Sequence, residues 1–125
     1  MKSMVRVLIV DDHAAARLGL RLRLTREPDL TIVGEGSDLQ EGSALAMSLQ
    51  PDVVLVDLAL PDGDGIELVE RIRHHAPSSA CVVLSMHDSV ANRRRADSAG
   101  VAGFVGKQQP TEVLLTAIRA AACGA

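Results

Sequence analysis

The sequence has 125 residues, which is the size of one domain with a hydrophobic core of its own. Phe104 is the only residue among Phe, Trp and Tyr, so the core must be aliphatic. A formal net charge of -3 gives no electrostatic basis for direct binding to nucleic acid or to an anionic membrane. We expect a cytoplasmic protein with reduced thiols, because there is no signal peptide, no membrane-spanning apolar run and only two cysteines, without metal-ligand spacing.

The first expected strand covers residues 5–10, and two carboxylates, Asp11 and Asp12, follow it. The next segment, residues 14–25, is ambiguous because its leucines alternate with Gly and Arg as they would in a strand. Its Ala, Leu and Arg content favours a helix, and parallel strands need a crossover between them. We therefore predict a helix that Glu27-Pro28-Asp29 ends.

The middle of the chain continues this alternation. A short strand is expected at residues 30–35, and Ser37-Asp38-Leu39-Gln40 resembles a capping box that opens a helix to about Gln50. Residues 53–56 are an unbroken apolar run that suits a strand buried on both faces, and the run ends in Asp57. Residues 61–65 follow as a loop, and apolar residues then recur at helical spacing up to His75.

The last third predicts a strand at residues 81–84 that ends at Ser85, and a polar helix at residues 90–99 with Gly100 at its C-cap position. A fifth strand at residues 101–105 runs into Gly106-Lys107, and Pro110 begins a final helix to about Ala122. Strands and helices alternate strictly throughout. The sequence therefore predicts a doubly wound α/β domain with a five-stranded parallel sheet and helices on both faces.

Polar residues end four of these strands, and parallel strands place their carboxyl ends at one edge of the sheet. We expect the following residues to converge there: Asp11, Asp12, Asp57, Ser85 and Lys107. Crowded carboxylates repel unless a cation lies among them, and an all-oxygen set suits Mg2+. A lysine and a hydroxyl opposite such a site are what a transferring phosphoryl group requires. Asp57 would then be the nucleophile, forming an aspartyl phosphate.

Each residue also has a structural explanation. Asp12 could cap a helix beside a solvated Asp11, Ser85 could cap a turn, and Lys107 could be surface charge. Asp57 is harder to explain in this way, because an acid at the end of a buried strand loses solvation unless it is paired.

Over essentially its whole length the chain resembles a response-regulator receiver domain of two-component signalling. The matching positions are the acidic pair Asp11-Asp12, the phosphoacceptor Asp57 in VDLALPDGDG, the Ser/Thr position Ser85 in VVLSMHD, the aromatic switch position Phe104 and the invariant lysine Lys107 in GFVGK. The Asp-Asp-His opening and Leu-Ser-Met-His-Asp resemble the NarL/LuxR-like branch, whose receivers usually precede a helix-turn-helix domain. The resemblance implies a single receiver domain over residues 1–125 without an output domain.

The resemblance also implies a flavodoxin-like, CheY-like fold with strand order 2-1-3-4-5. Asp12 and Asp57 would ligate Mg2+ together with the backbone carbonyl of Ala59, with Asp11 acting largely through water. A histidine kinase would phosphorylate Asp57, and Mg2+, Lys107 and Ser85 would hold the phosphoryl group. Phe104 would then move inward and remodel the surface of the fourth helix, fifth strand and fifth helix. Such a domain is a signalling module rather than an enzyme, and its output would be control of transcription through a DNA-binding domain or partner.

Two departures from the family pattern stand out. Gln108 follows Lys107 where many relatives have Pro, which puts the family's cis peptide in doubt here. Met86 is bulkier than the small residue common after the Ser/Thr position, so access of the phosphoryl group is expected to be narrower.

The first helix also predicts an association surface. Family alignment turns Leu20 and Leu24 inward with Ala16 and Gly19, which leaves Leu18 and Leu22 exposed between arginines. We predict a homodimer through the first and last helices. The alternative is that two exposed leucines are unremarkable.

Two other functions compete with a phosphoaccepting module. One is a Mg2+-dependent phosphohydrolase of small molecules, which the lack of a substrate-binding cap or long loop disfavours. The other is a receiver-like interaction module that is never phosphorylated, which the complete set of acids and Lys107 disfavours. Dinucleotide binding is set aside because the loop after the first strand has no G-x-G-x-x-G motif.

Overall fold

The computed structural model describes residues 4–124, and its centre is a five-stranded sheet. All neighbouring strands in this sheet are parallel. In spatial order the strands are β2 (Leu30–Gly36), β1 (Val5–Val10), β3 (Val53–Asp57), β6 (Ala80–Ser85) and β7 (Gly103–Gly106). Counting only these five strands along the chain, the order is 2-1-3-4-5, so the predicted topology is confirmed.

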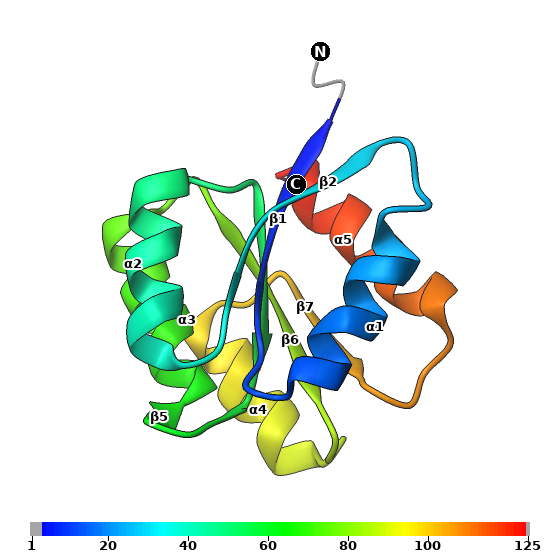
Figure 1. Ribbon diagram of the computed structural model, residues 1–125. Coiled ribbons are helices and arrows are strands. Elements are labelled where there is room, and N and C mark those ends of the chain that lie inside the picture. The colour runs from blue at the N-terminus through cyan, green and yellow to red at the C-terminus, as the bar shows by residue number, and fades with distance from the viewer. Residues whose placement is uncertain (1–3, 125) are drawn as a thin grey trace.

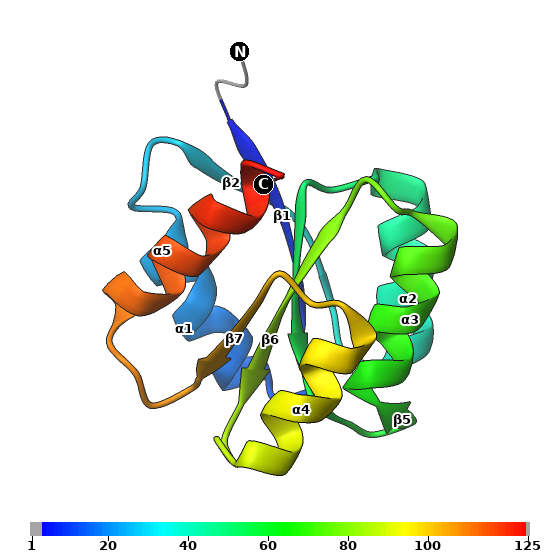
Figure 2. The ribbon, with the colours of Figure 1, turned by 180° about the vertical axis from the view of Figure 1, so that it is seen from behind.

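The five helices of the described residues cover the two faces of the sheet (Figure 1, Figure 2). The helices α1 (Ala14–Leu24) and α5 (Thr111–Ala122) lie on one face, where their apolar residues share a cluster with β1, β3, β6 and β7. On the other face lie α2 (Leu39–Leu49), α3 (Gly65–His75) and α4 (Val90–Ala99). The ambiguous segment at residues 14–25 is therefore a helix, because a crossover must connect β1 to β2.

The core is aliphatic, as predicted. All five residues of β3 are buried, which is what a central strand of a sheet covered on both faces requires. Leu20 and Leu24 of α1 pack into the core, whereas Leu18 and Leu22 are 45% and 57% exposed. Phe104 is only partly buried, at the margin of the cluster beneath α3 and α4. The predicted inward and outward faces of α1 are thus confirmed.

Several predicted boundaries were wrong. The segment after β3 is not a plain loop, because β4 (Ala59–Leu60) and β5 (Gly63–Asp64) form a small antiparallel pair. The fifth strand begins at Gly103 rather than Val101, because the Val101 amide donates to Ala96 O at the end of α4. Pro110 is the N-cap of α5 rather than its first helical residue, since its ψ of 152° is not helical.

The cap of α2 also differs by one residue. Asp38, not Ser37, is the N-cap, and its carboxylate accepts from the Glu41 amide at 2.7 Å. Glu41 reaches back in turn, but it accepts from the amide of Ser37, the residue before the N-cap, at 2.7 Å. A charged carboxylate is a stronger acceptor than a hydroxyl at the positive end of a helix, so Asp38 takes the position.

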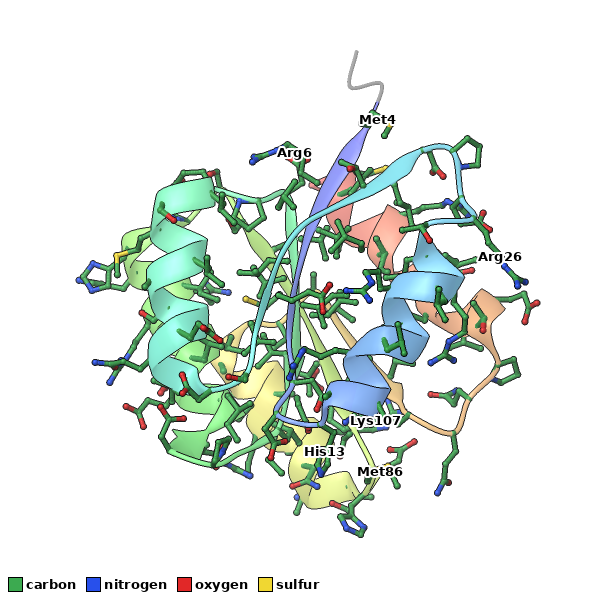
Figure 3. The ribbon with its side chains drawn as sticks, in the orientation of Figure 1. Met4, Arg6, His13, Arg26, Met86 and Lys107 are labelled. Carbon is green, nitrogen blue, oxygen red and sulfur yellow. The ribbon has the colours of Figure 1, made fainter. Side chains whose placement is uncertain are left out.

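The carboxyl ends of the parallel strands lie at one end of the molecule. Figure 3 shows His13, Met86 and Lys107 together at this end, opposite Met4 and Arg6. Within residues 4–124, no helix has both the length and the apolar character needed to cross a membrane.

Candidate functional site

Asp57 is a buried acid at the end of the central strand, with its side chain 4% exposed. Its Oδ1 accepts from the Ala59 amide at 3.1 Å, and its Oδ2 accepts from Lys107 Nζ at 3.0 Å. The following loop folds back closely, because the Gly65 amide donates to Leu58 O at 2.8 Å. A Cβ at Gly65 would collide with the carbonyl oxygen of Asp57, which explains why the loop ends in glycine.

Lys107 joins two carboxylates that lie far apart in the sequence. Its ammonium nitrogen is 2.7 Å from Asp11 Oδ2 in addition to its contact with Asp57. Asp11 is completely buried, and the Lys107 side chain is only 14% exposed. The backbone holds the lysine in place, since the Lys107 amide donates to Ser85 O at 2.8 Å. The three charged groups therefore form one buried cluster at the carboxyl end of the sheet.

The pKa values of the three groups in this cluster are shifted in different directions. Burial raises the pKa of Asp57 above its ordinary value, and the hydrogen bond from Lys107 offsets this only in part. Burial acts on Asp11 in the same direction, but hydrogen bonds from Lys107 and His13 outweigh it and hold the pKa of Asp11 below its ordinary value. Burial opposes the charge on Lys107, yet its two carboxylate partners raise its pKa. Asp57 is therefore the more basic carboxylate of the pair.

Asp12 and His13 lie next to the buried acids and are more exposed to solvent than they are. Asp12 is partly exposed, and His13 Nδ1 lies 3.0 Å from Asp12 Oδ1 and 3.3 Å from Asp11 Oδ1. Ligand atoms of Asp11, Asp12, His13 and Asp57 all lie within 4.8 Å of one another. Three carboxylates at this spacing fit a hard divalent cation such as Mg2+. The acid cluster expected from the sequence is thus present.

Sequence reasoning missed His13, because no metal-ligand spacing involves the histidines. The signal that could have found it is adjacency, since His13 directly follows the acid pair and precedes the first residue of α1. Arg17 was missed too, and it donates to the carbonyl oxygen of Asp11 from the first turn of α1. Both residues hold the Asp11-Asp12 turn against the helix.

Ser85 lies at the same edge, but its hydroxyl group is engaged locally. Ser85 Oγ donates to His87 O at 2.9 Å and accepts from the His87 amide at 3.0 Å. Asn92 in α4 also donates to His87 O, at 2.9 Å. The hydroxyl is therefore tied to the loop that leads into α4.

An arginine side chain lies over the ring of Phe104. The Arg93 guanidinium carbon lies 4.7 Å from the ring centroid, and Arg93 also pairs with Asp88. Asp88 is in the loop that follows Ser85, so the aromatic position and the hydroxyl position are linked through α4. Of the two departures, the Lys107-Gln108 peptide is trans, and Met86 is 56% exposed at the surface.

Comparisons with known proteins agree with this geometry. The family model described as the response regulator receiver domain matches residues 7–119. The nitrate/nitrite response regulator protein NarL of Escherichia coli K12 is 36% identical over 118 residues, which are 94% of this chain and 55% of that protein. The chain thus spans about half the length of the curated relatives it matches.

Solved structures show the same fold. A two-component response regulator of the LuxR family from Aurantimonas sp. SI85-9A1 superposes with a TM-score of 0.93 at 34% identity, covering 98% of this chain and 87% of the other. The isolated REC domain of RcsB from Salmonella enterica serovar Typhimurium, solved with the phosphomimetic BeF3-, gives 0.85 at 30% identity, covering 93% and 86%. The chain therefore belongs to the response regulator receiver domain family, in its NarL/LuxR-type branch.

Proposed function

We propose that Asp57 accepts a phosphoryl group from a histidine kinase in the presence of Mg2+, and that this modification switches the surface the domain presents to partners. The observation that carries the proposal is the position of Lys107, whose ammonium group contacts both Asp57 and Asp11 beside a group of carboxylates that fits a divalent cation. The combination of a nucleophile, a fixed cation and a metal-binding group meets the needs of phosphoryl transfer.

Asp57 acts as the nucleophile in this reaction. One of its carboxylate oxygens forms a bond to phosphorus while the bond from phosphorus to the kinase imidazole nitrogen breaks, and the departing imidazole takes up a proton. Its raised pKa makes the Asp57 carboxylate a better nucleophile than an ordinary one. Lys107 can neutralise the charge on the transferred group, because its ammonium group already lies at Asp57 Oδ2 and can bind a phosphoryl oxygen there.

Asp12 and Asp57 would hold a divalent ion together with the Ala59 carbonyl, and the ion would supply charge neutralisation for the phosphoryl oxygens. Asp11 has a different task. It is completely buried and bound to Lys107, so it anchors the ammonium group and supports the ion through water. The carboxylates thus divide into one that reacts and also binds the ion, one that only binds the ion, and one that positions the lysine.

Ser85 and Phe104 would carry the change outward. The Ser85 hydroxyl must leave His87 to bind a phosphoryl oxygen, and this movement displaces the loop that holds Asp88. Asp88 pairs with Arg93, which lies on the Phe104 ring, so loop movement frees the ring to turn inward. The surface formed by α4, β7 and α5 would change as a result.

The partners of the domain follow from its family and its surface. We propose a histidine kinase as phosphodonor, a cytoplasmic location for this domain, and a role in controlling transcription through a DNA-binding domain or partner. Leu18 and Leu22 on α1 are exposed together with Val113 on α5, which is 37% exposed, and both helices lie on the same face of the sheet (Figure 2). A second copy of the chain is the proposed occupant of this surface.

Intact-mass spectrometry with a small phosphodonor tests the function. We expect one phosphoryl adduct per chain, which does not form when EDTA is present from the start and is absent from Asp57→Asn. Asp97 is an exposed acid on α4. The variant Asp97→Asn is therefore the matched control and should be phosphorylated as the wild type is. No adduct on the wild type would indicate a receiver-like module that is never phosphorylated. Repeated turnover of a phosphate ester would indicate a phosphohydrolase.

A further inference from the structure

His13 lies beside the acid cluster, and its ring contacts the carboxylates of Asp11 and Asp12. It is the N-cap residue of α1, but its side chain makes no capping hydrogen bond. Its backbone amide donates to Asp11 Oδ1 at 2.9 Å, which fixes the residue beside the acids. The ring Nδ1 is 3.0 Å from Asp12 Oδ1 and 3.3 Å from Asp11 Oδ1.

The ring and Lys107 use different carboxylate oxygens. Lys107 Nζ contacts the Oδ2 atoms of Asp11 and Asp57. The His13 ring faces the Oδ1 atoms of Asp11 and Asp12. The ring therefore lies beside carboxylate oxygens that Lys107 does not contact, and the lysine does not compete with it for these oxygens.

The distances between the His13 ring nitrogen and the carboxylate oxygens match those between neighbouring ligands of a bound divalent ion. Adjacent ligands in an octahedron with bonds near 2.1 Å are about 3.0 Å apart, and ligands of a tetrahedral zinc ion are about 3.3 Å apart. The two ring-to-carboxylate distances are 3.0 and 3.3 Å. Opposite ligands in an octahedron are about 4.2 Å apart, so the group, which spans at most 4.8 Å, needs to close only slightly. The His13 side chain is 68% exposed and is free to make this adjustment.

We propose that His13 Nδ1 is a direct metal ligand, and that it gives this site a specificity for imidazole-binding ions such as Zn2+ and Ni2+ that a site of carboxylates alone would lack. Mg2+ prefers oxygen and water, whereas imidazole suits the later first-row ions. With His13 included, the site offers four ligand atoms, from Asp11, Asp12, His13 and Asp57. If all four bind a tetrahedral zinc ion directly, its coordination shell is closed and no position is left for a phosphoryl oxygen. The inference deepens the proposed function by making phosphoryl acceptance sensitive to the kind of metal available.

The chain contains competing zinc ligands that must be removed first. His74 and His75 lie edge to face on α3 with ring centroids 4.7 Å apart, and Cys123 is an exposed thiol. A background carrying His74→Gln, His75→Gln and Cys123→Ser leaves His13 and His87 as the only histidines. His87→Asn in this background is the matched control, because His87 is also exposed at the loops around the site.

Titration calorimetry with Zn2+ alone and Mg2+ alone, without a phosphodonor, measures specificity. We expect His13→Asn to raise the Kd for Zn2+ at least about tenfold, because losing a mere hydrogen-bonding partner of a metal ligand already costs about that much, while the Kd for Mg2+ changes less than twofold. His87→Asn should change neither constant. An unchanged Zn2+ affinity in His13→Asn, or equal weakening of both ions, would overturn the inference, since equal weakening means that His13 only positions the acids.

Nitrogen NMR of protein labelled at histidine provides the direct test. Zn2+ should shift the Nδ1 resonance of His13 and leave that of His87 in place, and Mg2+ should shift neither by ligation. A Zn2+-induced shift at His13 Nε2 or at His87 alone would contradict ligation by Nδ1. Because no phosphodonor is present, these results stand apart from the proposed phosphorylation, which can fail while the metal specificity holds.

Discussion

Lys107 Nζ lies 3.0 Å from Asp57 Oδ2, and the same ammonium group lies 2.7 Å from the completely buried Asp11. One cation thus compensates two carboxylates at the end of an apolar sheet. A buried carboxylate without a partner is costly, so the lysine has a structural as well as a chemical role.

The first prediction concerns this balance of charge. Lys107→Met leaves two buried carboxylates facing each other without a cation, and should lower the free energy of unfolding by about 3 kcal/mol. Asp57→Asn removes one of the charges and should raise the free energy of unfolding. Urea unfolding followed by circular dichroism measures both, because the chain has no Trp for fluorescence. Equal urea midpoints for Lys107→Met and wild type would show that the lysine does not stabilise the acids.

The second prediction concerns pH. Because the pKa of Asp57 is raised on folding, the folded chain binds more protons than the unfolded chain between 3.8 and the raised value, and stability falls as pH rises through that window. Asp57→Asn lacks this loss. Its stability advantage over wild type should therefore grow as pH rises above 3.8 and then become constant, in urea unfolding measured at a series of pH values. Asp11 acts oppositely, because its lowered pKa stabilises the fold until pH falls below 3.8. An advantage that shrinks with rising pH would contradict the assignment.

Much of the fold could be predicted because burial leaves a local pattern in the sequence. The run at residues 53–56 shows a strand buried on both faces, and parallel strand ends bring Asp11, Asp57 and Lys107 together whatever their separation in the chain. The site could be assembled from topology for this reason.

The remaining features depend on contacts that no local pattern encodes. Asp62, in the turn between β4 and β5, caps α2 by accepting from the Leu39 and Gln40 amides at 2.7 and 3.0 Å. The stacking of Arg93 on Phe104 likewise joins a helix to a strand. An arginine in a basic run looks like a solvated surface residue until the aromatic ring beneath it is known.

The third prediction concerns the metal. Millimolar Mg2+ should raise the melting temperature of the wild type, because an ion that binds only the folded state stabilises it by mass action. Asp12→Ala should abolish this rise while leaving the melting temperature without Mg2+ unchanged or higher, since a repelling charge is removed. A large loss of stability without Mg2+ would mean that Asp12 is chiefly a structural residue. Thermal unfolding by circular dichroism gives both values.

The fourth prediction concerns the link between Arg93 and Phe104. Because Phe104 is the only Phe, incorporation of fluorophenylalanine gives a single fluorine resonance that reports on this ring. Arg93→Ala should shift the resonance in unphosphorylated protein, because the guanidinium group leaves the ring face. Arg94→Ala, the exposed neighbour, is the control and should leave it in place. Equal shifts in both variants would indicate a general charge effect instead of the stacked contact.

The fifth prediction concerns association. Leu18→Glu combined with Leu22→Glu places charge on the exposed apolar face of α1 and should convert a homodimer to a monomer. Met47→Glu changes a similarly exposed residue on α2 and should not. Sedimentation of all three proteins, with and without a phosphodonor, measures this. A wild type that is monomeric under both conditions, or a dimer that survives the double change, removes this surface from consideration.

The central claim is that Asp57 itself carries the phosphoryl group. Borohydride reduction of the phosphorylated protein converts an aspartyl phosphate to homoserine, and tandem mass spectrometry of the peptides then locates the modified residue. The proposed function predicts homoserine at position 57, formed only when both Mg2+ and the phosphodonor were present. Homoserine at position 11 or 12, or none at any position of a protein that had gained phosphate, would contradict it.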